Sequence, residues 1–541
     1  MANTITDNRT VLFVAKTSAP ASETWEASGG GGSATEDDEI FIEGDTSIAE
    51  QISDSIRVLL WDNGTTQDLS NGHIYIWANC GVVGLLETKA NAGFTVRLTG
   101  PTSANFVEWE VGGSDSWPTA ILGGWVMFVV DTASTPSNTG GTPPALTAIQ
   151  KVGISAQTVS MTRAADNTWV DAGWFLPDAT PGIIIEGRNG GSTDWTFADI
   201  NTELGDAAGM FVQGEGGAWV CNAPIQFGVN DTVTHAFTDT NQVILWSDQE
   251  HAASDLYKLS ALGNSGGTTN VTMGIKTGTG DDATGAQGCI FKAATGGVRW
   301  DMDFDDPDVD GVNMYGCLFI HGGAFVLDDA AVSFISSAYL DCTSALVSNS
   351  EQLRCSVIDA NTADDEPFMT TDDMGDLVFC SFEFSDGHGV GLTTPRVASQ
   401  SSKGNSFLGY GAIGTTDAAI ENDTGGAVEI STTSGASVAE HTYQNGSGAS
   451  TTVTGAVAIT VTPIVTGSEV RAYLTGTGTE VDGIENSAST FHELTLVSGE
   501  AVDIVVHSYD PPREPIRVNN VSFTADQDFV VFQRLDRNFI N

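Results

Sequence analysis

The residues best suited to chemistry lie in one acidic run, which reads Asp301-Met-Asp-Phe-Asp-Asp-Pro-Asp-Val-Asp-Gly311. Asp306, Asp308, Asp310 and the Gly that follows reproduce the opening D-x-D-x-D-G of a calcium loop, in which alternate carboxylates converge on a hard cation. The twelfth position counted from Asp306 is Cys317 instead of a bidentate Glu, and neither flank has helical periodicity. An EF-hand is therefore excluded. Two interpretations stay open: a structural Ca²⁺ held by Asp306, Asp308 and Asp310, or a solvated acidic turn.

Motifs for catalysis are weak elsewhere. Gly263-Asn-Ser-Gly-Gly267 matches G-x-S-x-G, but no helical segment follows Ser265, so a nucleophile elbow is not expected. The eight His show neither H-x-H nor H-E-x-x-H spacing. Paired carboxylates could hydrolyse glycosidic bonds if their separation were roughly 5 Å or 6.5 to 9.5 Å, which a sequence does not give. We therefore predict no catalytic residue and no cofactor besides the Ca²⁺ left open above.

Six tryptophans are candidates for stacking on sugar rings, and amphipathic Trp is equally suited to a β core or a subunit interface. We expect the core for Trp169, Trp174, Trp195, Trp219, Trp246 and Trp300.

Charge limits the partners. The 541 residues include 70 Asp and Glu against 20 Lys and Arg, a formal net charge of −50. This balance argues against nucleic acid, since phosphate binding needs concentrated Lys and Arg. The longest uncharged apolar run, 120–130, is about half of what a bilayer span requires, so no membrane insertion is expected. Such a surface fits a saline environment, where salt screens self-repulsion, or simply a very soluble particle surface.

The elements expected around these residues are short strands. Helical periodicity is almost absent, and 62 Gly interrupt the chain every few residues. The prediction is an all-β fold with four parts: an N-terminal arm or attachment region at 1–60, a β-sandwich or jelly-roll-like domain at 61–210, a parallel β-helix (solenoid) at 211–455, and a C-terminal β-sandwich with a docking tail at 456–541. The fold class is thus a parallel β-helix flanked by N-terminal and C-terminal β-sandwich-like domains.

A repeat supports the β-helix. The spacings from Cys317 to Cys342, from Cys355 to Cys380 and from Cys380 to Asn405 are each 25 residues, whereas Cys342 to Cys355 is 13, about half a coil. A repeat of 20 to 30 residues without helices is typical of stacked β coils, with Cys and Phe as inward ladders. The alternative is chance recurrence in an ordinary sandwich. The seven Cys form no C-x-x-C pair, so we expect buried thiols.

The last residues differ from the rest of the chain in being neutral, because four Arg are balanced by four acids between 513 and 541. We predict that this tail docks on another protein, either a neighbouring protomer or a different component of its assembly, since Arg can pair bidentately with carboxylates in a desolvated interface. The alternative is that the tail closes its own chain's sandwich. The residues predicted for the interface are Arg513, Arg517, Arg534, Arg537, Phe529 and Phe532.

The order of these parts resembles bacteriophage virion proteins, namely tail fibres, tailspikes and head fibres. The likeness includes coils such as Tyr315-Gly-Cys-Leu-Phe-Ile320 and the ending that begins Pro511-Pro-Arg-Glu-Pro-Ile-Arg517. The resemblance implies a homotrimer in the virion, assembled in the host cytoplasm with other virion proteins, that contacts a host surface glycan or receptor. It identifies no site residue. The function favoured is a non-enzymatic fibre or spike for host attachment. The alternative is a tailspike-type polysaccharide depolymerase, either a glycoside hydrolase or a lyase.

Overall fold

The structure is a computed structural model that describes residues 4–14, 24–28, 34–37, 39, 41, 47–51, 55–118, 123–159, 167–178, 180–186, 194–204, 209–214, 217–228, 234–237, 240, 243–246, 257–263, 269–276, 286–293, 299–328, 332–395, 400–433, 436–476, 478–497, 501–508, 512–523 and 527–535. These residues form many strands, one α-helix, α1 (Phe197–Leu204), and short 3₁₀ helices at Val83–Leu85, Lys89–Asn91, Leu146–Ala148 and Met374–Asp376. The all-β prediction is confirmed. None of the helices described is both long and apolar enough to cross a membrane. The chain divides into two compact units, 1–343 and 344–541, described in turn.

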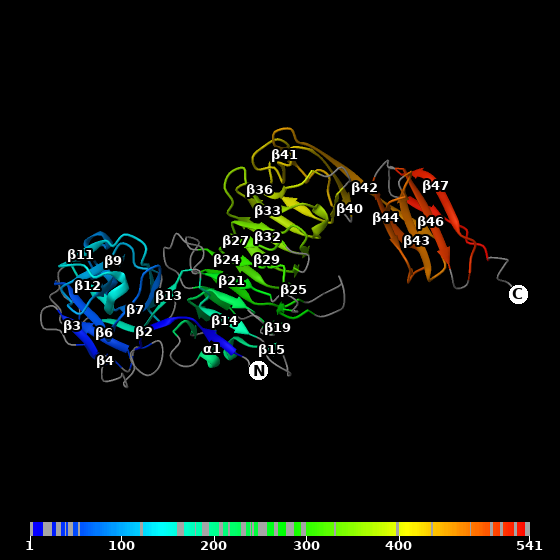
Figure 1. The fold of residues 1–541 in the computed structure, drawn as a ribbon. Coiled ribbons are helices and arrows are strands. Elements are labelled where there is room, and N and C mark those ends of the chain that lie inside the picture. Colours follow the sequence, from blue (N-terminus) through cyan, green and yellow to red (C-terminus); the bar gives the residue numbers. More distant parts are fainter. Residues whose placement is uncertain are drawn as a thin grey trace. The chain divides into compact units, whose positions relative to one another are not determined.

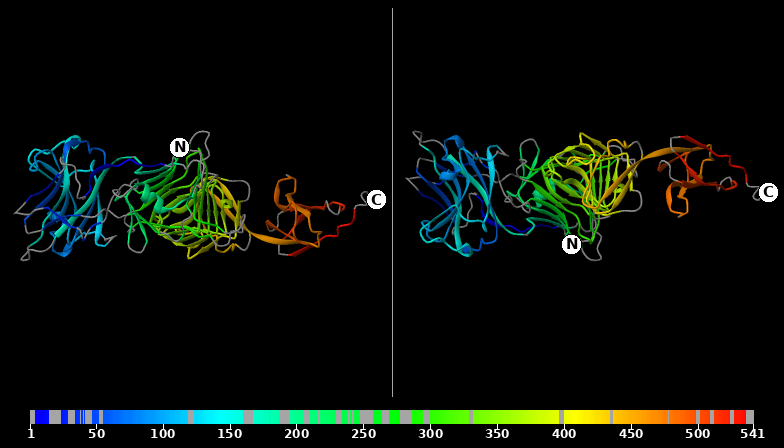
Figure 2. Two further views of the ribbon diagram at one scale, coloured as in Figure 1. Left: turned by 90° about the horizontal axis from the view of Figure 1, so that it is seen from below. Right: turned by 90° about the horizontal axis from the view of Figure 1, so that it is seen from above.

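The first unit begins with two antiparallel sheets. One has the order β10 (Trp125–Asp131), β7 (Gly72–Cys80), β13 (Asn167–Pro177), β5 (Ser47–Gln51), β4 (Thr35–Asp37), with β2 (Thr10–Val14) also paired to β13. The other has the order β11 (Asn138–Gly140), β9 (Phe106–Gly112), β8 (Phe94–Thr99), β12 (Ile149–Ala156), β6 (Arg57–Gln67), β3 (Thr24–Ser28). Side chains of both sheets share one core, in which Phe94 of β8 stacks on Phe128 of β10 at 4.9 Å between ring centroids. Figure 2 shows these strands in blue and cyan.

Residues 1–60 were expected as an attachment arm, and their strands from β2 to the start of β6 belong to these two sheets. Leu12 and Phe13 of β2 are 1% exposed and lie in the shared core, as does Ile48 of β5. The reason is the largely apolar sequence Thr10-Val-Leu-Phe-Val14, which pairs antiparallel with β13 at the side of that strand. The glycine-rich segment 29–33 lies outside the described residues.

Parallel pairing follows from β14 onward, so it starts before the expected residue 211. Consecutive strands pass through three sheets, and from β17 onward every third strand lies parallel beside its predecessor. The first sheet contains β1 (Thr4–Asp7, antiparallel to β14), β14 (Ile183–Glu186), β18 (Ile225–Phe227), β21 (Lys258–Ala261), β24 (Trp300–Asp303) and β27 (Gly322–Val326). The second contains β15 (Asp194–Trp195), β19 (Thr234–Phe237), β22 (Thr269–Met273), β25 (Val309–Tyr315) and β28 (Val332–Ile335). The third contains β16 (Phe211–Gln213, antiparallel to β17), β17 (Trp219–Cys221), β20 (Val243–Trp246), β23 (Ile290–Ala293), β26 (Leu318–Ile320) and β29 (Ala338–Leu340). Figure 1 shows β21, β24 and β27 stacked in green.

The cysteine spacing is explained by the corner before each strand of the third sheet. Cys317 precedes β26, and the equivalent residue before β29 is Ser337, whose Oγ accepts a hydrogen bond from the Cys317 amide at 3.3 Å. Cys342 instead follows β29, where its thiol donates to the Phe319 carbonyl at 3.4 Å. The 25-residue step from Cys317 to Cys342 is therefore not a strand-to-strand step, and that part of the prediction is wrong.

The second unit continues the same pattern. Its sheets contain, first, β30 (Ser344–Leu346), β33 (Pro367–Thr371), β36 (His388–Leu392), β39 (Ile420–Asn422) and β41 (Tyr443–Asn445); second, β31 (Glu351–Leu353), β34 (Leu377–Val378), β37 (Gln400–Lys403), β40 (Ala427–Thr433) and β42 (Ser450–Thr462); third, β32 (Ser356–Ala360), β35 (Ser381–Ser385) and β38 (Ser406–Leu408). Here the 25-residue steps are confirmed, because Ser356 pairs with Ser381 and Ser381 with Ser406. The inward Phe382 and Phe407 stack at 4.9 Å.

The seven thiols are free and buried, as predicted. Burial raises the pKa of the Cys317 and Cys342 thiols to about 12, so these groups stay protonated and unreactive.

The C-terminal part of the second unit begins within β42. That strand is parallel to β40 up to Gly455 and antiparallel to β45 (His492–Val497) from Ala456 onward. Its other neighbour there is β48 (Gln527–Val530), which runs parallel to it. A second sheet has the order β44 (Glu480–Ile484), β43 (Ser468–Leu474), β46 (Ala501–Ser508), β47 (Ile516–Ser522). Burial alternates along β46, which directs Val502, Ile504 and Val506 into the core shared by the two sheets.

Candidate functional site

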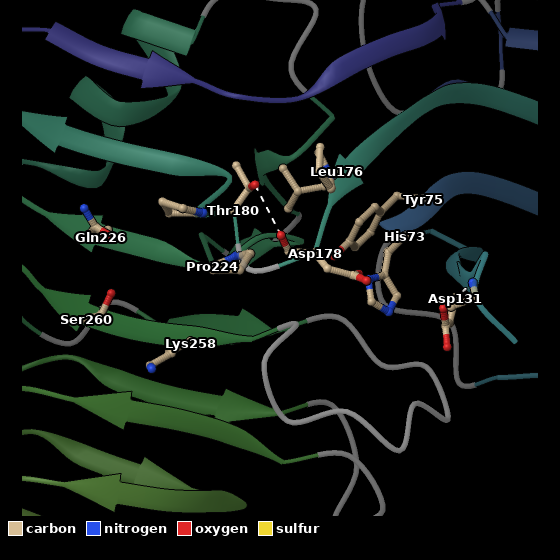
Figure 3. Close-up of a pocket in the computed structure, with 13 residues that line it drawn as sticks. His73, Tyr75, Asp131, Leu176, Asp178, Thr180, Pro224, Gln226, Lys258 and Ser260 are labelled. Carbon is tan, nitrogen blue, oxygen red and sulfur yellow. Dashed lines mark hydrogen bonds and ion pairs between the residues drawn. The ribbon is translucent and has the colours of Figure 1, made fainter. Parts of the chain in front are cut away.

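The candidate site is a pocket of about 540 Å³ in the first unit, between the ends of the antiparallel strands and the first parallel sheet (Figure 3). Its lining residues come from β7, β10 and β13, from the connection after β13, and from β18 and β21. They are His73, Tyr75, Asp131, Ala133, Leu176, Pro177, Asp178, Thr180, Pro181, Pro224, Gln226, Lys258 and Ser260.

One wall carries two carboxylates around an imidazole. Asp131 at the end of β10 is the cross-strand partner of His73 on β7, and His73 Nδ1 lies 3.2 Å from Asp178 Oδ1. Asp178 is held by its own amide, which donates to the Asn71 carbonyl at 3.1 Å. The Asp131 carboxylate accepts the amide of Ala133 at 2.7 Å. These backbone contacts fix both acids at the pocket while leaving Asp178 half exposed.

The floor is aromatic and apolar. Tyr75 is fully buried and stacks on Trp174 with centroids 5.4 Å apart and ring planes within 8°. Burial raises the pKa of Tyr75, so its hydroxyl stays protonated. Among the described residues, neither that hydroxyl nor Trp174 Nε1 has a hydrogen-bond partner. Leu176 and Pro177 complete this side.

The opposite wall is the outer face of the parallel sheet. Gln226 of β18 pairs with Ser260 of β21, which pairs with Asp303 of β24, so the three side chains lie in one row. Lys258 donates a short hydrogen bond to Asp303. Burial acts to raise the pKa of Asp303, but the hydrogen bonds from Lys258 and Asp305 outweigh it and lower that pKa. The shared hydrogen bond with Asp303 raises the pKa of Asp305.

The pocket therefore combines acceptors, donors and an apolar floor. Asp131 and Asp178 accept hydrogen bonds, whereas Gln226, Lys258 and Ser260 can donate them. A few placed polar groups around an apolar surface are the usual composition of a site for a small polar molecule.

The predicted calcium ligands lie elsewhere: Asp306 and Asp308 are in the turn between β24 and β25, and Asp310 is the second residue of β25. Asp306 Oδ1 accepts the amide of Asp308 at 2.8 Å, so one candidate ligand is engaged by its own turn. Asp308 is exposed, and the Asp310 side chain lies outside the described part of the chain. No group of three or more His, Cys, Asp or Glu that could hold a metal ion occurs among the side chains described. The calcium loop stays a prediction.

The predicted interface residues lie in the C-terminal part of the second unit. Phe529 packs edge-on against Phe523 at 5.9 Å, facing the core. Phe532 is 80% exposed. Arg513 donates to the Gln533 carbonyl at 3.2 Å, and Arg517 pairs with Asp503 at 3.0 Å. Arg534 is exposed, and Arg537 lies outside the described residues. One side of the described tail thus packs on its own domain, and docking on another chain stays a prediction.

Other candidates are accounted for more simply. Trp174, Trp219 and Trp300 are buried, as expected for core residues. Trp169 is half buried and donates to Asp37 at 2.7 Å. Ser265 and the side chains of Trp195 and Trp246 lie outside the described residues.

The pocket residues were missed by sequence reasoning. His73, Asp131, Asp178 and Lys258 belong to no motif, and nearly 190 positions separate the first from the last. The one usable signal was the apolar run 126–130, since pairing it with 74–78 places Asp131 opposite His73.

Comparisons with known proteins give little. No family model and no curated protein matches the chain. Two solved structures are similar to parts of it: carbohydrate-binding modules from the β-sandwich superfamily (14% identity, 31% of this chain and 62% of that one) and an exo-β-agarase (12% identity, 31% of this chain and 25% of that one), each with a TM-score of 0.22. The chain spans less than two thirds of the length of either. At this TM-score neither establishes a fold or a function for this chain.

Proposed function

We propose that the chain is a non-enzymatic structural protein of a bacteriophage virion, a fibre or spike exposed on the particle that takes part in host-surface attachment. The observation that carries the proposal is the regular strand succession, in which every third strand from β17 to β29, and again from β30 to β40, lies parallel beside its predecessor. This succession supports a parallel β-helix, the scaffold implied by the resemblance to phage fibres and spikes. A solenoid whose coils contact only their neighbours is suited to a stiff spacer.

The charge supports exposure on a particle. A net charge of −50 keeps a protein soluble at high local concentration and disfavours unspecific association. The partners proposed are other virion proteins and copies of the same chain, with assembly in the host cytoplasm.

The pocket is proposed as the attachment site, with a hydroxyl-rich surface glycan as ligand. Asp131 and Asp178 can accept hydrogen bonds from sugar hydroxyls, and Ser260 and Gln226 can donate to them. The apolar floor at Leu176 suits the C–H face of a sugar ring.

The depolymerase alternative rests on one observation, the acidic pair Asp303 and Asp305 beside Lys258. The pKa of Asp303 is lowered and that of Asp305 is raised, as in a pair of catalytic carboxyl groups that act as base and acid. Their shared hydrogen bond, however, brings the carboxyl groups closer than the roughly 5 Å or 6.5 to 9.5 Å that glycoside hydrolysis uses. Binding is therefore favoured over hydrolysis.

The test compares the wild-type protein with D131N/D178N for binding to surface polysaccharide of the host, measured by calorimetry. We expect affinity to fall at least about tenfold, because two charged acceptors are lost. D306N, which removes an acid from the exposed turn, is the matched control and should bind as wild type. Equal affinity for all three proteins would reject the pocket as the attachment site. Release of reducing or unsaturated ends by the wild type would favour the depolymerase.

Location on the particle is tested separately. Gold-labelled antibody against the purified chain should decorate intact virions, and unlabelled particles that nevertheless infect normally would reject the virion role.

A further inference from the structure

Residues 527–535, which comprise β48 and the segment that follows it, place alternate residues on two sides. β48 pairs with β42, and the backbone beyond it stays close, since the Val531 amide donates to the Thr462 carbonyl at 3.0 Å. Val531 is 4% exposed, and Gln533 Oε1 accepts the Val465 amide at 2.7 Å. One set of alternate residues therefore faces the chain's own core.

The other set faces outward and forms an ordered stripe. Val530 is 56% exposed and Phe532 is 80% exposed. Asp528 and Arg534, the next residues of the same alternate set on either side, are also exposed. In chain order, the outward stripe is Asp528, Val530, Phe532, Arg534.

A neighbouring strand widens the apolar part. On the far side of β42, Val461 pairs with His492, so the preceding residue, Phe491, lies beside Thr462, the register partner of Val530. Phe491 is 51% exposed. Three large exposed apolar side chains thus lie near one another, and a contiguous apolar patch indicates an interaction site.

We propose that this stripe pairs with the same stripe of a second copy of the chain, related by a two-fold axis. Its order is negative, apolar, apolar, positive, and reversing it gives its own complement. Two antiparallel copies would place Asp528 of each against Arg534 of the other and pack Val530 on Phe532 twice. Self-complementarity under reversal is the defining property of a two-fold interface.

Charge selects a second copy as the occupant. The whole chain carries −50, yet residues 513–541 contain four Arg and four acids, so two copies can meet here without net repulsion. The inference does not depend on the virion role. It replaces the three-fold assembly implied by the resemblance with an even-numbered one.

The experiment is a charge swap on the full chain, followed by light scattering across 1 to 50 µM. Wild type is expected at twice the chain mass of 56.5 kDa. D528R and R534D should each weaken association about tenfold or more, because each places like charges together, and D528R/R534D should restore it to within about threefold. F532S should also weaken association, whereas L408S, which changes a residue 66% exposed on β38, should not.

Circular dichroism keeps the result interpretable, because each variant must retain the wild-type spectrum. A wild-type mass of one chain or three chains overturns the proposal. So does a double variant that associates no better than the single ones, since the salt pair would then be absent.

Discussion

The antiparallel sheets of residues 10–177 and the parallel sheets after them bury different kinds of polar side chain. In the former, Arg97 of β8 and Glu108 of β9 are both nearly buried and joined by a 2.7 Å hydrogen bond from Nε. In the parallel sheets the buried polar groups described are mainly amides and hydroxyls: Asn222, Ser337, Ser350, Gln352, Ser402, Asn405, Asn422 and Ser431. Asp301 is the buried carboxylate there among the residues described, and it accepts the Ala324 amide at 2.8 Å.

The difference follows from what each pairing places side by side. Across an antiparallel pair, Arg97 faces Glu108, so opposite charges can be set against each other. In a parallel stack, the same corner recurs about 4.8 Å away in the next strand, and like charges there would repel. An amide avoids this, since Asn405 accepts from the Cys380 amide at 2.9 Å and donates to the Leu377 carbonyl at 2.7 Å. Stacked strands thus select neutral groups that both donate and accept.

The largest expected effect is the loss of the buried ion pair. R97A would leave Glu108, 1% exposed, without its charged partner, and removal of one member of a buried pair typically costs about 3 to 5 kcal/mol. Urea unfolding followed by tryptophan fluorescence would measure it. R471A, which removes a more exposed Arg paired with Glu480, is the control and should change stability much less. Equal effects would show that burial does not set the strength of these pairs.

The matching change in the parallel sheets should cost less. N405A leaves the Cys380 amide and the Leu377 carbonyl unpaired, a penalty of about 1 to 3 kcal/mol. The backbone amides of residues 377–381 should also exchange hydrogen faster in N405A than in the wild type. N405D keeps the acceptor but cannot donate, so it should be no more stable than N405A, and recovery by N405D would contradict the argument about paired donors and acceptors.

The sequence predicted the strand succession in part because one corner residue recurs. Cys380 and Asn405 hold equivalent corners, and their 25-residue spacing gave a true step. Ser337 replaces Cys at another corner, so the cysteines alone misled between 317 and 342. The Ser337 hydroxyl accepts the Cys317 amide, and the Cys317 thiol is hydrogen-bonded to the backbone of Cys289. Two residue types thus serve equivalent corners, so a search for identical residues misses the match.

The pocket could not be predicted for a different reason. His73, Asp178 and Lys258 come together only because the connection after β13 carries the chain from an antiparallel sheet to a parallel one. No local pattern encodes such a junction. The neutral tail, by contrast, could be recognised in the sequence, because net charge is counted from the residue types alone and does not depend on the fold.

A smaller effect tests a buried charge in the antiparallel sheets. Glu50 is 1% exposed, and neither carboxylate oxygen has a hydrogen-bond partner among the residues described. Burial raises its pKa, with Arg57 opposing. A raised folded-state pKa means that stability is present at low pH and is lost as pH rises through that pKa. E50Q should therefore stabilise the folded protein at pH 7 by about 1 kcal/mol. It should also weaken the loss of stability between pH 5 and pH 7, as measured by urea unfolding at both pH values. A less stable E50Q at pH 7 would mean that the charged form is well solvated.

The smallest expected effect is a loss of stability as pH falls, opposite to the trend for Glu50. It concerns a histidine among the parallel sheets. His441 Nδ1 lies 2.7 Å from the Ser437 carbonyl and donates to it, and Nε2 lies 2.7 Å from Ser402 Oγ, from which the neutral ring accepts a hydrogen bond. Burial lowers its pKa, with the Ser437 carbonyl and Glu440 opposing. A lowered folded-state pKa gives stability that is present above pH 6.5 and lost as pH falls through the folded value.

The measurement is the stability difference between wild type and H441Q at pH 7 and at pH 5.5. The Gln amide can keep one hydrogen bond but does not titrate, so the difference should shrink at pH 5.5, by less than about 1 kcal/mol. His492, whose pKa burial also lowers, titrates equally in both proteins and cancels. A difference that is constant or grows toward acid would show that the fold does not lower the pKa of His441, and that stacked strands tolerate a buried cation after all.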